Sequence, residues 1–69
     1  MRNYKLGEYL HQARISKKLT QEELGEKLGI NGKSVSKWER GISLPSYHIL
    51  KKLCELLEIS SDHLLELLS

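Results

Sequence analysis

Apolar residues recur at helical spacing along five stretches of this 69-residue chain. Leucine and other apolar side chains return every three or four positions, which places them on one face of an α-helix. The five stretches are residues 4–17, 21–28, 32–40, 47–57 and 61–67. No stretch has the alternating period that is typical of a strand. The pattern therefore predicts an all-α fold, a compact bundle of five short helices.

A tight turn is predicted between the second and third helices. Thr20 and Glu23 have the spacing of a capping box at the start of the second helix. Gly29 can adopt the positive φ that ends a helix, and Asn31 is a strong N-cap for the next one. Two short helices joined by a turn that contains glycine describe a helix-turn-helix, which we place at residues 21–40.

The motif also has a characteristic residue pattern. It consists of Gln21, Leu24, Gly29, Ile30, Val35 and Trp38, closed by the run Trp38-Glu39-Arg40-Gly41. This pattern resembles that of the phage-repressor-like (Xre-type, lambda-repressor-like) helix-turn-helix family, and the likeness covers residues 6 to 65. The resemblance implies a single DNA-binding domain over residues 1–69. By this resemblance, such proteins are mostly bacterial or phage repressors.

Charge is distributed unevenly along the chain. The formal net charge of +2 is too small to argue for a nucleic-acid partner. However, residues 1–44 carry nine basic and five acidic side chains, a net +4, whereas residues 45–69 carry two and four, a net −2. A basic front and an acidic back are expected if one face meets phosphate, although an ordinary mixed surface stays open as the alternative.

The composition indicates the compartment in which the protein is expected to work. No apolar run approaches the ~20 residues of a membrane span, and the first ten residues lack the apolar core of a signal peptide. The lone cysteine, Cys54, cannot form an internal disulfide, which fits a reducing compartment. We therefore expect a cytoplasmic protein with no membrane partner.

The third helix is predicted to be the recognition helix, which buries one face and presents the other to the major groove. Val35 and Trp38 fix its buried side, so Lys33 and Lys37 stand over one another on the outer surface. Lysine can donate to guanine O6 and N7 or to phosphates. The resemblance assigns base contacts to Gly32, Lys33, Ser36 and Lys37. The glycine has no side chain, so direct readout rests chiefly on the lysines, and DNA shape or a second subunit is expected to add specificity.

Phosphate contacts are predicted around the same helices. Gln21 opens the first helix of the motif, where backbone N–H groups and the positive helix pole favour an anion. By resemblance, its side chain contacts the DNA backbone. Further phosphate candidates are Asn31, Ser34, Arg40 and Ser43. Plain solvated surface is the alternative for each lysine and serine.

The resemblance also implies an ion pair. In the family, an arginine of the first helix pairs with the glutamate that closes the recognition helix. Arg14 and Glu39 occupy those places. A bidentate pair would tie the recognition helix to the first helix.

The C-terminal segment holds more leucines than one small core needs. Helical phase predicts that Leu64 and Leu65 are buried. The leucines expected at the surface are Leu56, Leu67 and Leu68. An exposed apolar patch of this kind favours an interface. It would serve a homodimer that sets two recognition helices ~34 Å apart on a palindromic operator, or it would pack on a C-terminal extension.

Other classes of function have less support. The three histidines, His11, His48 and His63, lie in different helices without ligand spacing. We therefore predict no enzyme, no metal site and no cofactor. The function indicated is a sequence-specific transcription regulator, most simply a repressor, that reads the major groove with helix 32–40. The alternatives are a protein-interaction or adaptor module, and the N-terminal DNA-targeting domain of a larger regulator; salt-dependent binding to duplex DNA separates DNA binding from pure protein contact.

Overall fold

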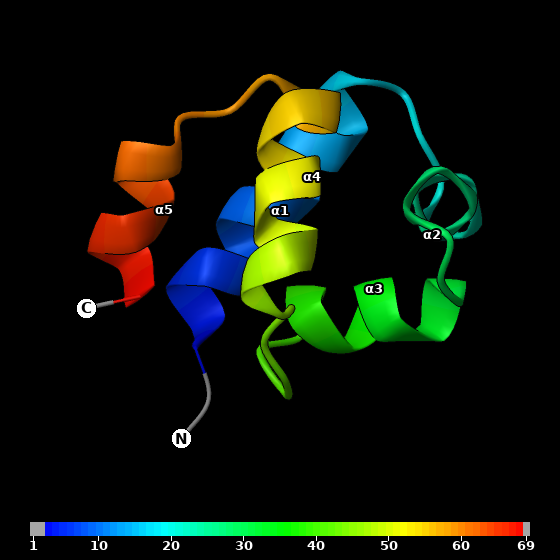
Figure 1. Cartoon of the computed structure of the whole chain (residues 1–69). Coiled ribbons are helices and arrows are strands. Elements are labelled where there is room, and N and C mark those ends of the chain that lie inside the picture. Colours follow the sequence, from blue (N-terminus) through cyan, green and yellow to red (C-terminus); the bar gives the residue numbers. More distant parts are fainter. Residues whose placement is uncertain (1–2, 69) are drawn as a thin grey trace.

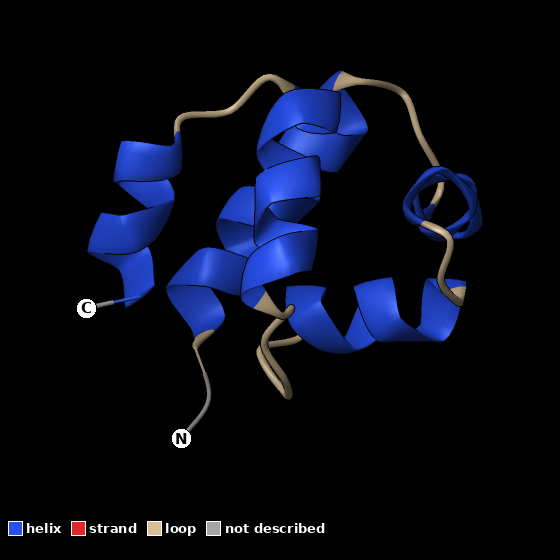
Figure 2. Cartoon of the chain, in the orientation of Figure 1, coloured by secondary structure: helices blue, strands red, loops and turns tan. Residues whose placement is uncertain are grey.

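Five short helices make up most of the molecule (Figures 1 and 2). The computed structural model describes residues 3–68. The helices are α1 (Tyr4–Ser16), α2 (Gln21–Leu28), α3 (Gly32–Glu39), α4 (Tyr47–Leu57) and α5 (Ser61–Leu68). The predicted all-α architecture is confirmed, and each predicted helix agrees with the structure to within one residue at either end. None of the helices within residues 3–68 has the length and apolar character needed to cross a lipid bilayer.

The predicted caps of the helix-turn-helix are present. The Glu23 N–H donates to the Thr20 hydroxyl at 3.0 Å, and the Thr20 N–H donates to the Glu23 carboxylate at 2.8 Å. Gly29 ends α2 with φ of 74°, in the left-handed region that glycine adopts without strain. Asn31 then caps α3 by accepting the Lys33 N–H at 2.7 Å. Local side-chain chemistry thus sets the bounds of the motif.

Helices α2 and α3 cross steeply and touch through their backbones. Figure 1 shows α2 along its axis while α3 lies across the view. A Cβ on Gly25 would lie 2.9 Å from the Ile30 carbonyl oxygen, and a Cβ on Gly32 would lie 3.0 Å from Glu22 Cα. The two glycines therefore let the helices pack closer than any side chain would allow.

The core consists almost entirely of leucine and joins all five helices. Its buried members are Leu6, Leu10, Leu24, Leu28, Val35, Trp38, Leu53, Leu57 and Leu64. Val35 and Trp38 are the buried residues of α3, as predicted. Since these two residues orient the inner face of α3, they also determine which face remains exposed.

The burial predicted for the C-terminal leucines is partly wrong. Leu65, predicted to be internal, is 59% exposed. Leu56, Leu67 and Leu68, predicted to be exposed, are partly buried against the core. The reason is the rotation of α5: its inward face is centred on Leu64, and residues three and four positions further on share that face, whereas the next residue does not.

Helix α1 meets the C-terminal end of α3 without an intervening side chain. Gly7 is buried there, and a Cβ at this position would lie 2.6 Å from the carbonyl oxygens of both Trp38 and Glu39. Such a distance is far below van der Waals contact, so only glycine fits. This contact sets how closely α3 lies against α1.

An ion pair joins the same two helices. Arg14 is 7% exposed, and its Nε and Nη2 donate to the two Glu39 carboxylate oxygens at 2.6 and 3.0 Å. Its Nη1 donates to the Leu19 carbonyl oxygen at 2.6 Å. Arg14 and Glu39 thus form the bidentate pair that the family resemblance implies. One guanidinium fixes the end of α3 and the segment that leads into α2.

We expect the substitution Gly7→Ala to destabilise the protein. Alanine in place of a helical glycine ordinarily stabilises by ~0.5–1 kcal/mol. Here the added methyl group would overlap two carbonyl oxygens, so we expect a net loss of ~1–3 kcal/mol, as for overpacking. Thermal unfolding followed by circular dichroism measures this, with Gln12→Ala on the exposed side of α1 as the control. An unchanged or raised Tm for Gly7→Ala would contradict the close approach.

The ion pair generates a second expectation. Arg14→Ala and Glu39→Ala should each lower the Tm, because removal of one partner leaves a buried charge, at a cost of ~3–5 kcal/mol. The double variant should lose less than the sum of the single losses. Thermal unfolding of the four proteins tests this, and strictly additive losses would show that the two side chains are not coupled.

Candidate nucleic-acid interface

The outer face of α3 carries two exposed lysines. Lys33 and Lys37 are both exposed, and they lie four residues, or ~6 Å of helix rise, apart. They lie away from the buried Val35 and Trp38, as the sequence predicts. Two ammonium groups on the exposed face of a helix can donate hydrogen bonds to base edges or to phosphates.

A groove lies where the N-terminal ends of α2 and α3 meet. Its volume is about 350 Å³, and it is lined by Gln21, Glu22, Asn31, Gly32, Lys33 and Ser36. The structure therefore gathers three of the four predicted base-contact residues and two of the predicted phosphate-contact residues around one opening. The fourth base-contact candidate, Lys37, lies one turn further along α3.

Gly32 has a packing role at this groove. The position of its absent side chain lies 3.0 Å from Glu22 Cα and 3.2 Å from Glu22 Cγ. A side chain at this position would be directed into α2 rather than outward. The missing side chain in the predicted reading face is thus a consequence of close helix packing.

Glu22 is a groove residue that the sequence pattern did not single out. It is exposed, and it occupies the first turn of α2 next to Gln21. The available signal was this neighbouring position at the start of the helix, where acidic residues are also favoured by the helix pole. A carboxylate here makes one side of the groove acidic and the lysine side basic.

The remaining phosphate candidates differ in how they are held. Arg40 lies back along α3, with its Nε 3.2 Å from the Ser36 hydroxyl oxygen, to which it donates. Ser34 is half-buried, and Ser43 is exposed in the loop between α3 and α4. The side chain of Asn31 is already engaged in capping α3. Of these four residues, Asn31 lines the groove and Arg40 contacts the groove residue Ser36, whereas Ser34 and Ser43 do not line it.

A single carboxylate connects the groove to α1. The Glu39 side chain is 5% exposed, and besides Arg14 it accepts from His11 Nδ1 at 2.8 Å and from Gln21 Nε2 at 3.1 Å. An ionised carboxylate can only accept, so His11 Nδ1 carries the proton in this contact. That nitrogen therefore cannot accept from the Arg14 Nη2, which lies 3.1 Å away. Glu39 thus accepts hydrogen bonds from side chains of both α1 and α2.

Hydrogen bonding sets the ionisation of Glu39. Burial raises the pKa of its carboxyl group, but the hydrogen bonds from Arg14, His11 and Gln21 outweigh this and hold the pKa below its usual range. Glu39 is therefore charged at neutral pH. By contrast, burial and the nearby Glu55 raise the pKa of the Cys54 thiol, which leaves it protonated and poorly nucleophilic.

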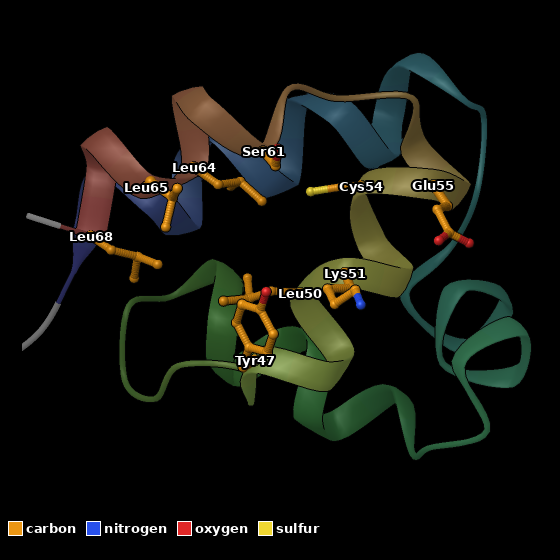
Figure 3. Close-up of a pocket in the computed structure, with 9 residues that line it drawn as sticks. All are labelled: Tyr47, Leu50, Lys51, Cys54, Glu55, Ser61, Leu64, Leu65 and Leu68. Atoms are coloured by element: carbon orange, nitrogen blue, oxygen red, sulfur yellow. The ribbon is translucent and has the colours of Figure 1, made fainter.

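A second groove lies between α4 and α5 (Figure 3). Its volume is about 340 Å³, and Leu50 and Cys54 of α4 and Leu64 of α5 point into it. Tyr47, which is 74% exposed, lies at its edge. The groove is lined mainly by apolar side chains and lies apart from the helix-turn-helix.

Nowhere between residues 3 and 68 do three or more histidine, cysteine or acidic side chains gather as a metal site would require.

Comparison with known proteins agrees with this architecture. Residues 10–64 match the helix-turn-helix family model HTH_3. The transcriptional activator BcrR of Enterococcus faecalis is 40% identical over 58 residues, which cover 84% of this chain and 28% of BcrR. Three Bacillus subtilis regulators are matched over 47% to 56% of their length. The chain thus covers between 28% and 56% of the length of these four relatives.

Solved structures show the same fold. The P22 c2 repressor in complex with a synthetic operator superposes with a TM-score of 0.80 at 32% identity, over 86% of this chain and 89% of the repressor. The biofilm regulator SinR in complex with DNA has a TM-score of 0.77 at 33% identity, over 87% and 97% of the two chains. With five helices, a capped helix-turn-helix and a family match over residues 10–64, the chain belongs to the phage-repressor-like (Xre-type) helix-turn-helix family.

Proposed function

We propose that this chain is a sequence-specific DNA-binding domain of a transcription regulator, and that α3 reads the major groove of duplex DNA. The observation that carries the proposal is the exposed pair Lys33 and Lys37 on the face of α3 opposite its buried side. Lys33 also lines the groove between α2 and α3, together with Gln21. The P22 c2 repressor and SinR, which share this fold, were solved with DNA bound. A helix that presents donors on one face and packs on the other meets the requirement of a recognition helix.

Base readout is assigned to the N-terminal half of α3. Lys33 and Lys37 would donate to purine acceptors, with Ser36 as an additional hydroxyl and Gly32 contributing only its backbone. The side chains assigned to phosphates are Gln21, Asn31, Ser34, Arg40 and Ser43. Two lysines provide few base contacts, so sequence-dependent DNA shape is expected to contribute to specificity.

A dimer on a palindromic operator is the arrangement we propose for the bound state. Two copies would place their α3 helices ~34 Å apart in successive major grooves. The apolar groove between α4 and α5, with Tyr47 and Leu65 beside it, is the surface that suits this contact. Of the three leucines that the sequence suggests for an interface, Leu68 lines this groove, whereas Leu56 and Leu67 do not line it. All three are partly packed on the core.

Repression is the regulatory outcome that we assign. A domain that occupies an operator obstructs polymerase without any further surface, whereas activation requires a productive protein contact. BcrR, named as an activator, is more than three times as long as the segment that it shares with this chain. The match to part of longer regulators also supports a role as the DNA-targeting domain of a larger protein, with activity set by the rest.

The reading face can be tested with DNA selected from a random duplex pool. We expect Lys33→Ala and Lys37→Ala each to weaken binding to the selected operator by ~1–3 kcal/mol, or about 5- to 150-fold. A lysine that contacts phosphate would also lower the slope of log affinity against log salt by ~1 when removed. Fluorescence anisotropy over a salt series measures both quantities.

The matched control is Lys52→Ala, which removes an exposed lysine from α4. It should leave the affinity within about twofold of the parent protein, because α4 lies outside the helix-turn-helix. If the double variant Lys33→Ala/Lys37→Ala kept the affinity and the sequence preference of the parent, the assignment of the reading face would be wrong.

A further inference from the structure

The geometry points to Glu39 as a positioning residue for DNA binding: it holds the side-chain amide of Gln21 in the orientation in which that amide meets DNA. The inference rests on the proposed function and deepens it. Glu39 closes α3, and Gln21 opens α2. The contact between them, 3.1 Å from Gln21 Nε2 to Glu39 Oε1, joins the two ends of the helix-turn-helix across 18 residues.

The carboxylate determines which end of the amide faces it. A glutamine amide carries two N–H donors on its nitrogen and an acceptor on its oxygen, and the two ends are nearly the same size. A charged carboxylate only accepts, so it excludes the amide oxygen and takes one N–H. The second N–H of Gln21 is then left for the groove that Gln21 lines. An N–H donor is what a phosphate requires.

Glu39 can hold Gln21 because it is itself held. Its side chain is 5% exposed, and Arg14 binds both carboxylate oxygens, at 2.6 and 3.0 Å. Arg14 is in turn fixed by the Leu19 carbonyl oxygen at 2.6 Å. A long glutamine side chain normally loses conformational freedom when it binds a partner. Because Gln21 is already held by Glu39, less conformational entropy remains to be lost when it binds DNA, and this favours binding.

The same carboxylate also fixes the end of the recognition helix. Its ion pair with Arg14 anchors the C-terminus of α3 against α1, while its contact with Gln21 orients a side chain at the N-terminus of α2. The contact with Gln21 is thus a role of Glu39 beyond its ion pair with Arg14.

The test is a double-mutant cycle on operator affinity. Gln21→Ala and Glu39→Gln should each weaken binding about 3- to 10-fold, the usual range for loss of one hydrogen bond. Glu39→Gln keeps the shape but offers an amide that can turn its own N–H groups toward Gln21. The double variant should bind about as well as Gln21→Ala alone, because Glu39 acts through Gln21. All affinities are measured at a temperature at which circular dichroism shows every variant fully folded.

A control cycle pairs Glu39→Gln with Lys37→Ala, whose effects should multiply because the two residues contribute separately. A second readout needs no DNA: the side-chain amide signals of Gln21 in a ¹⁵N correlation spectrum should move in Glu39→Gln and stay in place in Lys37→Ala. If Glu39→Gln does not fold, Glu39→Asp replaces it: the shorter side chain keeps the charge that balances Arg14 and draws the carboxylate back from its donors, Gln21 included.

The outcomes separate the two ideas. If the operator is bound through Lys33 and Lys37 but the effects of Gln21→Ala and Glu39→Gln multiply, Glu39 does not position Gln21 and the proposed function stands. Unmoved Gln21 amide signals in the Glu39 variant would overturn the inference as well. If no duplex is bound at all, the proposed function fails and the positioning role fails with it.

Discussion

The buried carboxylate of Glu39 is the group on which the arrangement of the first three helices depends. A carboxylate that is removed from water is costly unless several donors surround it. Here α1 supplies Arg14 and His11, and α2 supplies Gln21. The chain thus satisfies one charge only when three helices come together in one way. Close packing through Gly7 of α1 and Gly25 of α2 reinforces the same arrangement, because neither contact tolerates a Cβ.

Much of the fold could be predicted from the sequence because its determinants are local. Helix bounds follow from caps such as Thr20 and Asn31, and the exposed face of α3 follows from Val35 and Trp38. The rotation of α5 could not be predicted: periodicity shows which residues share a face, but only tertiary packing decides that Leu64 rather than Leu65 turns inward. The Gly7 contact and the bond from Gln21 to Glu39 are non-local in the same sense.

In the candidate site, too, local features could be predicted from the sequence and tertiary contacts could not. Exposure of the two α3 lysines was predictable from helical phase alone. The close contact between Gly32 and Glu22 was not predictable, because it depends on how steeply α2 crosses α3. Close packing holds α2 and α3 rigidly together, but it leaves the proposed reading surface without a side chain at Gly32. The apolar groove between α4 and α5 lies on other helices, so the proposed dimer contact and the proposed DNA contact would use different parts of the molecule.

The position of Gly32 has a consequence for how this domain could acquire a new target sequence. A Cβ there would lie 3.0 Å from Glu22 Cα, so a side chain at the first residue of α3 would require α2 to shift. If α3 reads DNA as proposed, retargeting would proceed through the exposed Lys33 and Lys37, the half-buried Ser36, or Glu22 on the facing helix. A library built to redirect the domain should hold Gly32 constant and randomise those four positions.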